Sequence, residues 1–153
     1  MFSDEFFMKE ALKEARRAES SDDVPVGAVI VLKNRVIARG HNQVECLNDP
    51  TAHAEMLAIT SAAEYLKSKW LTDCVLYVTI EPCSMCAGAL VLSRIAKVVF
   101  GAADPKTGAG GSVINILHNV KLNHRIKVLS GILEQDCAGL VQDFFKKKRA
   151  SRN

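Results

Sequence analysis

The hydrophobic positions of the chain follow two spacings, one typical of helices and one typical of strands. In the first twenty residues, apolar side chains recur every three or four positions, which predicts a helix with one buried face. Ser3 or Asp4 can cap its start by accepting a hydrogen bond from a free backbone N–H. We expect this helix to run from about residue 4 to 19, with its buried face formed by Phe7, Ala11, Ala15 and Ala18.

Apolar runs of strand length follow this helix. Residues 26–32 form a continuous run, residues 33–35 are polar and compatible with a turn, and residues 36–41 resume as a strand, so the sequence predicts a β-hairpin. Further strands are expected at 74–80, 97–101 and 126–129, and further helices at about 52–67, after the Pro82-Cys83 turn through residue 91, and at about 133–148.

The order of these elements indicates the fold class. Helices interleaved between apolar strands predict a three-layer α/β/α sandwich around a mixed five-stranded sheet. A chain of 153 residues with 48% hydrophobic content is long enough for one core and short for two. We therefore expect a single domain over residues 1–153.

Composition narrows the setting. The first turns carry Asp4, Glu5, Lys9 and Glu10, so they cannot be the apolar core of a signal peptide, and no apolar stretch reaches membrane-spanning length. We expect a soluble, cytoplasmic protein. The five cysteines have no disulfide-framework spacing, which fits a reducing compartment.

Two short motifs carry the candidate chemistry. Thr51-Ala52-His53-Ala54-Glu55 opens one predicted helix, and Glu81-Pro82-Cys83-Ser84-Met85-Cys86 opens another. One imidazole and two thiolates, from His53, Cys83 and Cys86, suit Zn²⁺, which favours tetrahedral nitrogen and sulfur ligation. Three protein ligands leave one position open, as in catalytic zinc sites.

The placement of Glu55 follows from helix geometry. Glu55 and His53 are two residues apart, about 200° around a regular helix, so both can serve one metal only if it lies over the helix N-terminus. Pro82 is favoured at the start of a helix, where no N–H is needed. Two helix N-termini would then face one ion, and their positive dipole ends favour the thiolate forms of Cys83 and Cys86.

Two further segments have weaker signals. Residues 102–111 are rich in glycine and contain Lys106, but they lack the spacing of a phosphate-binding P-loop and can be an ordinary connection. The last predicted helix ends in Lys146, Lys147, Lys148 and Arg149 after Phe144 and Phe145. Such lysines often only complement the helix dipole, whereas a basic cluster beside an outward aromatic ring suits RNA.

The motifs His53-Ala54-Glu55 and Pro82-Cys83-Ser84-Met85-Cys86 resemble the signature of the zinc-dependent cytidine deaminase-like superfamily. Nearly the whole chain is similar to the branch of bacterial tRNA-specific adenosine deaminases, apart from Pro105. The residues that carry this closer resemblance are Pro25-Val26-Gly27-Ala28-Val29, Gly40-His41-Asn42, Met85 to Leu90, Lys106 to Ser112, Asn123-His124-Arg125 and Asp143-Phe144-Phe145.

The resemblance implies hydrolytic conversion of adenosine to inosine at the wobble position of a tRNA anticodon, with one Zn²⁺ per subunit of a homodimer. It implies that Glu55 shuttles protons while the activated water attacks C6 of adenine. It also implies a base pocket formed by Val26, Asn42, Ala54 and Pro82. The residues expected to contact the tRNA anticodon stem-loop are Asp104, Lys106, Asn123, Phe144, Phe145 and Arg149.

Two alternatives stay open at this point. A deaminase of a free base or nucleotide, of guanine or cytosine type, would use the same zinc set without an RNA surface. A non-catalytic zinc-stabilised RNA-binding module would need a fourth ligand, which Cys46, His41 or His118 could supply. The basic end and Lys106 weigh against the first alternative, and Glu55 weighs against the second.

Overall fold

The computed structural model describes residues 1–152, so Asn153, the last residue of the expected domain, lies outside the described residues. Five strands form one mixed sheet in the order β2-β1-β3-β4-β5. β1 is antiparallel to β2 and β3, while β3, β4 and β5 are parallel. The strands are β1 Gly27–Leu32, β2 Arg35–His41, β3 Val75–Ile80, β4 Lys97–Ala102 and β5 Lys127–Ser130.

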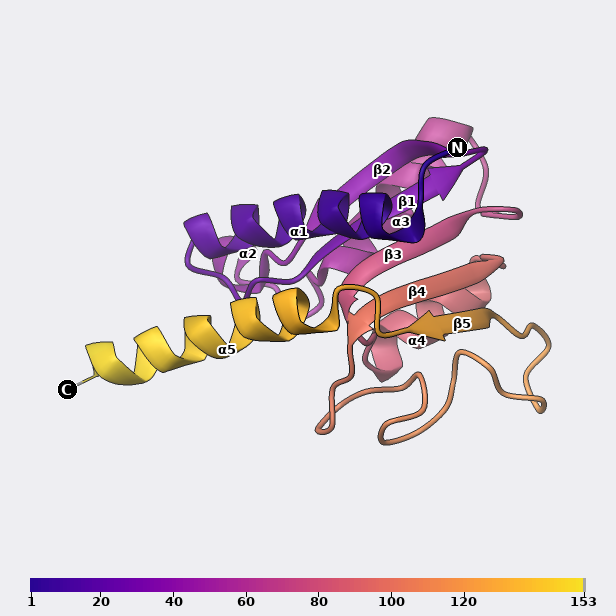
Figure 1. Cartoon of the computed structure of the whole chain (residues 1–153). Coiled ribbons are helices and arrows are strands. Elements are labelled where there is room, and N and C mark those ends of the chain that lie inside the picture. The colour runs from indigo at the N-terminus through magenta and orange to yellow at the C-terminus, as the bar shows by residue number, and fades with distance from the viewer. Residues whose placement is uncertain (153) are drawn as a thin grey trace.

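Helices cover both faces of the sheet, which confirms the predicted three-layer fold. Figure 1 shows α1 and α5 on one face and α3 and α4 on the other. Alternate strand residues serve the two faces, as the two-residue period of a strand requires. Ile30 and Leu76 pack with α3 and α4, and Val29 and Tyr77 pack with α1. The helices are α1 Asp4–Ser20, α2 Val44–Leu47, α3 Ala54–Leu66, α4 Ser84–Leu92 and α5 Glu134–Ser151.

The first helix matches its expectation closely. Ser3 is its N-cap, and the Ser3 hydroxyl accepts a hydrogen bond from the Phe6 N–H at 3.1 Å. The expected inward face is buried, at Phe7, Ala11, Ala15 and Ala18.

The structure moves the boundaries of two expected helices and adds one short helix. The helix expected from residue 52 begins at Ala54, and His53 precedes it in an extended conformation (φ −77°, ψ 151°). The last helix continues to Ser151, beyond its expected end at 148. The short α2 lies in a segment that we treated as a polar connection. Its first N–H groups are capped by Asp23, a contact from a distant part of the sequence that no local pattern reveals.

No helix within residues 1–152 combines the length and the apolar character needed to cross a membrane.

Candidate active site

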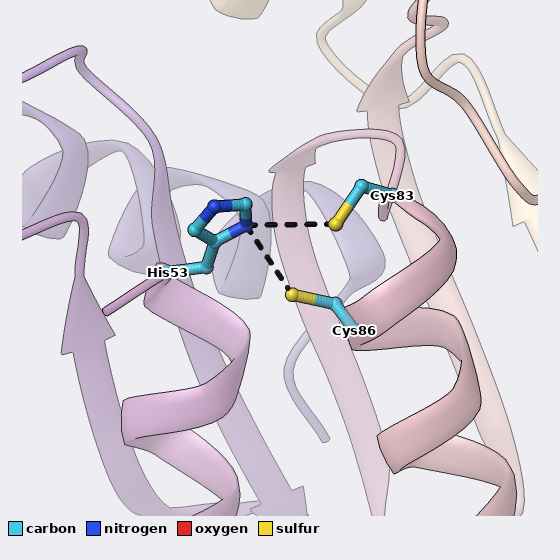
Figure 2. A group of neighbouring side chains, drawn as sticks. All are labelled: His53, Cys83 and Cys86. Atoms are coloured by element: carbon cyan, nitrogen blue, oxygen red, sulfur yellow. Dashed lines mark hydrogen bonds between the residues drawn. The ribbon is translucent and has the colours of Figure 1, made fainter. Parts of the chain in front are cut away.

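The metal-ligating residues stand at the starts of two helices. His53 is the N-cap residue of α3, and Cys83 is the N-cap residue of α4, with Cys86 one turn later. Both caps have extended backbones, and neither side chain makes the usual capping hydrogen bond. The imidazole and the thiol are therefore free to face each other across the gap between the two helices, as Figure 2 shows.

The cluster geometry fits a tetrahedral zinc ion. The Nδ1 atom of His53 lies 3.6 Å from the Cys83 sulfur and 3.5 Å from the Cys86 sulfur (Figure 2). Zinc bonds of about 2.0–2.1 Å to nitrogen and about 2.3 Å to sulfur, at tetrahedral angles, separate the two ligand atoms by about 3.5–3.6 Å. Within residues 1–152, His53, Cys83 and Cys86 form the cluster of side chains that could hold a metal ion. The residues present therefore fit zinc with one position open.

The same three side chains strongly shift one another's pKa values. Hydrogen bonds from Cys86 and then from His53 lower the pKa of the Cys83 thiol to about 3. The hydrogen bond with Cys83 raises the pKa of His53, and the hydrogen bond with Cys83 and burial both raise the pKa of Cys86. A bound divalent cation would replace the protons that link these side chains, because metal ligands bind in their deprotonated forms.

Glu55 lies beside the cluster in the first turn of α3. Its side chain is buried, and burial raises the pKa of its carboxyl to about 7. A carboxyl group that titrates near neutral pH can both accept and donate a proton under physiological conditions. Because His53 is extended while Glu55 is helical, both side chains reach the same space over the helix start. This is the arrangement that the sequence spacing predicted.

A pocket of about 290 Å³ opens at the cluster. Its size is at the lower end of small-molecule sites, which measure about 300–1,000 Å³. Its lining residues come from the segment before β1, the ends of β2 and β3, the starts of α2, α3 and α4, and the loop after β4. They are Asp23, Val24, Val26, Asn42, Val44, Glu45, His53, Ala54, Glu55, Ile80, Glu81, Cys83, Asp104 and Thr107.

Three of the four residues expected to form the base pocket line it, namely Val26, Asn42 and Ala54. The carboxamide of Asn42 donates to the Val24 carbonyl at 3.2 Å and accepts from the Val44 N–H at 3.4 Å. Pro82 does not line the pocket. Its carbonyl accepts a hydrogen bond from the Ala109 N–H at 2.8 Å.

Two buried carboxylates that sequence reasoning missed support the pocket walls. Asp23 accepts hydrogen bonds from the Glu45 N–H at 2.7 Å and the Cys46 N–H at 3.1 Å, and so holds α2. The Glu81 carboxylate accepts hydrogen bonds from the loop after β4. Burial raises the pKa of Glu81, but hydrogen bonds from Ser112 and from backbone N–H groups outweigh it and leave the pKa lowered. The only sequence signal for Glu81 was its place beside the Pro-Cys turn.

Most of the expected RNA-contact residues lie on the surface. Asp104 lines the pocket, and Lys106 is exposed on the same loop. On α5, Phe144 is 8% exposed and Phe145 is 43% exposed, so Phe145 is the outward ring of the pair. Arg149 is exposed one turn further along.

Asn123 lies away from this group. The pocket lies where β3 ends, whereas Asn123 precedes β5, which runs parallel to β3 and β4. Asn123 is therefore at the opposite end of the sheet, where its carbonyl accepts a hydrogen bond from the Arg94 guanidinium at 3.3 Å. The structure does not bring it together with the other candidates within one chain.

The fold and the site together define a class of protein. A His-Cys-Cys cluster and a buried glutamate at two helix N-termini, on a mixed five-stranded sheet, are the features of zinc-dependent nucleobase deaminases.

Comparison with known proteins agrees with this class. Residues 2–149 match the MafB19-like deaminase family. The chain is 51% identical to the tRNA-specific adenosine deaminase of Bacillus subtilis, over 99% of this chain and 97% of that protein. It is 54% identical to that of Aquifex aeolicus, over 95% of both chains. This chain is a deaminase and belongs to the family of tRNA-specific adenosine deaminases.

A solved structure from studies of A-to-I editing by tRNA:A34 deaminases shares the fold, with a TM-score of 0.85, 46% identity, and coverage of 88% of this chain and 98% of that chain. This match confirms the expected cytidine deaminase-like fold.

Proposed function

We propose that this protein hydrolyses adenosine to inosine at the wobble position of a tRNA anticodon, with one zinc ion held by His53, Cys83 and Cys86. The observation that carries the proposal is the buried Glu55 carboxyl, which lines the same pocket as His53 and Cys83 of the three-residue cluster. Relatives with about half of their residues identical are tRNA-specific adenosine deaminases, which favours tRNA over a free base.

The zinc ion would supply Lewis-acid activation of a water molecule. Glu55 accepts the proton of that water as its oxygen forms a bond to C6 of adenine. Glu55 passes this proton to the ring nitrogen, then takes the proton of the new C6 hydroxyl and delivers it to the amino group, so that the C6–N bond breaks and ammonia leaves. The burial of Glu55 suits this double role, because its carboxyl exchanges a proton near neutral pH. Glu55 is a proton carrier in this scheme and not a metal ligand.

The remaining pocket residues orient the base. Asn42 is fixed by its bonds to Val24 and Val44, so its carboxamide is held ready to hydrogen-bond the purine edge. Val26 and Ala54 supply apolar walls. The pocket of about 290 Å³ is far too small for an anticodon loop, so the target adenosine must leave the stack of the loop to reach it.

The RNA backbone and its flanking bases would contact the exposed residues around the pocket. Lys106 and Arg149 can neutralise phosphates, and the outward Phe145 ring can stack on an unpaired base. Asp104 joins the pocket wall to this surface. The proposal includes a homodimer, in which Asn123 of one subunit could contact RNA bound by the other, and a cytoplasmic location with its tRNA substrate.

The test is inosine formation in an unmodified tRNA, measured beside free adenosine, guanine and cytidine. We expect turnover of the tRNA and of its anticodon stem-loop, with little turnover of the free compounds. Turnover of a free base without tRNA would replace the proposal with the small-molecule alternative. Zinc binding without any deamination would favour the non-catalytic RNA-binding module.

A further inference from the structure

Glu81 is a buried carboxylate of the pocket that has no place in the proton transfer or the metal cluster. It follows β3 directly and is 3% exposed. Its Oε1 atom accepts hydrogen bonds from the Asp104 N–H at 3.0 Å and from the Ser112 hydroxyl. Its Oε2 atom accepts from the Gly110 N–H at 2.8 Å and the Ser112 N–H at 3.1 Å. Both oxygens are thus used twice, by one segment of chain.

These four hydrogen bonds close the 104–112 segment onto the metal-binding turn. The Ala109 N–H donates to the Pro82 carbonyl at 2.8 Å, and Gly108 forms an antiparallel bridge with Cys83. A Cβ atom at residue 108 would overlap the Glu81 carboxylate, so glycine is required for this approach. The backbone of the segment therefore lies directly against the Glu81 carboxylate and the turn that carries Cys83.

This packing depends on how the buried negative charge of Glu81 is compensated. Within residues 1–152, no Lys, Arg or His side chain forms an ion pair with Glu81. A buried carboxylate without a cation is tolerated only when hydrogen bonds replace its water. The 104–112 segment supplies all four of them, so the segment and the carboxylate hold each other in place.

The segment in turn carries substrate-facing groups. The Asp104 carboxylate accepts hydrogen bonds from the Lys106 N–H at 3.0 Å, the Thr107 N–H at 3.2 Å and the Thr107 hydroxyl at 2.8 Å. Asp104 and Thr107 line the pocket, and Lys106 is exposed beside them. A chain of hydrogen bonds thus runs from the end of β3 through Glu81 and Asp104 to the rim.

We propose that Glu81 is a positioning residue that sets the substrate-binding wall formed by the 104–112 segment. It acts on the affinity for tRNA and leaves zinc binding and proton transfer to the other residues. This inference rests on the proposed function, because it assigns the rim to tRNA.

Glu81→Gln tests the proposal with little change in volume. A carboxamide has one acceptor oxygen, so it can serve the Gly110 and Ser112 N–H groups while its NH₂ group faces the Ser112 hydroxyl. The NH₂ group then points at the Asp104 N–H, which loses its partner. We expect KM for tRNA to rise roughly tenfold, as for loss of a hydrogen bond to a charged acceptor, with kcat changed less than about threefold and zinc at one per chain.

Hydrogen exchange gives a readout that does not depend on activity. In Glu81→Gln, the Asp104 amide should exchange faster, together with Gly110 and Ser112 if the segment detaches. Glu134→Gln is the matched control, because it also removes one carboxylate, at an exposed position at the start of α5. It should change neither the amide exchange rates nor KM. Ser112→Ala removes one donor from Oε1 and should give a smaller rise in KM.

The outcomes separate this inference from the proposed function. A fall in kcat at constant KM, or a loss of zinc in soluble Glu81→Gln, would assign Glu81 to catalysis or to the metal site and overturn the inference. Unchanged KM and exchange in both variants would also overturn it. If Glu81→Gln does not fold, Ser112→Ala decides by the same readouts. If the parent forms no inosine in tRNA, the proposed function fails, while the exchange of the 104–112 amides still reports whether Glu81 anchors them.

Discussion

The proposed zinc cluster and the proposed RNA surface are built in opposite ways. The cluster takes its side chains from the first turns of α3 and α4, which the sheet holds in place, and its ligand atoms lie within 4.8 Å of one another. The RNA surface takes exposed side chains from a loop and from α5, elements far apart in sequence (Figure 1). Metal chemistry needs ligand positions defined within fractions of an ångström, whereas phosphate contacts tolerate movement.

Buried carboxylates connect these two regions. Glu81 secures the 104–112 segment and Asp23 secures α2, each by accepting backbone N–H groups next to the pocket. The exposed loop that carries part of the proposed RNA surface is thereby attached beside the metal cluster. The comparison therefore predicts that changes in the cluster abolish chemistry, while changes at the surface reduce affinity by degrees.

The largest effect is expected for Cys86→Ser. It removes a buried ligand of the proposed zinc ion, so zinc content and deamination should both fall to near background. Metal analysis and an inosine assay measure the two quantities. Cys137→Ser is the matched control, because Cys137 is also buried but lies outside the cluster, and it should keep its zinc. Full zinc occupancy in Cys86→Ser would show that the cluster is not the metal site.

Glu55→Ala should abolish chemistry while leaving the cluster intact. We expect deamination to fall about 10²- to 10⁴-fold, as for loss of a general acid–base group, with zinc content and tRNA affinity near those of the parent. Single-turnover rates, metal analysis and a binding assay distinguish these effects. Glu55→Gln, which keeps the shape, should be similarly slow. Near-normal turnover in either variant contradicts the proton-carrier role.

Phe145→Ala probes the surface without touching the cluster. Stacking on an unpaired base contributes about 1–3 kcal/mol, with little dependence on salt. We expect weaker tRNA binding at an unchanged salt slope, measured by titration at several salt concentrations. Phe144→Ala serves as the contrast, since Phe144 is buried and its loss should lower the thermal stability instead. Equal tRNA binding by Phe145→Ala and the parent would show that Phe145 does not stack on the RNA.

Lys106→Ala and Arg149→Ala should have smaller, salt-dependent effects. Each removes an exposed cation, so each should lower tRNA affinity at low salt and reduce the salt slope by about 1. Zinc content and thermal stability should stay at the level of the parent. Lys9→Ala, on α1, is a control for loss of one positive charge. A slope unchanged from the parent would place phosphate contacts on other residues.

The smallest effect concerns stability remote from both regions. Hydrogen bonds from Arg39 and then from Lys13 lower the pKa of Glu10 below its ordinary 4.5. A carboxyl with a lowered pKa stabilises the fold above its unfolded pKa, and this stabilisation disappears as the pH falls through the folded pKa. Glu10→Gln should therefore lower the free energy of unfolding at about pH 7 and converge with the parent near about pH 2.

Urea titrations at the two pH values measure this difference, and any loss of zinc in acid affects both proteins alike. Deamination by Glu10→Gln at neutral pH and low temperature should match the parent, because Glu10 lies outside the pocket lining. A stability difference that persists in acid would mean that packing, and not charge, is responsible.

The sequence alone determined most of the elements and indicated the candidate metal ligands. The helix and strand periodicities are local, so α1 and the β1–β2 hairpin followed from residue spacing. His53, Glu55, Cys83 and Cys86 were also recognisable, because each motif lies within one turn at a helix start and zinc accepts few sets of ligands.

Only the tertiary structure decided how distant segments meet. It showed that Phe145, and not Phe144, faces outward, that Pro82 is not among the residues that line the pocket, and that Asn123 lies at the other end of the sheet. It also revealed that Asp23 and Glu81 hold the pocket walls, through contacts across more than twenty positions in sequence. Such contacts depend on how the sheet and helices pack, and the spacing of residues along one element does not contain that information.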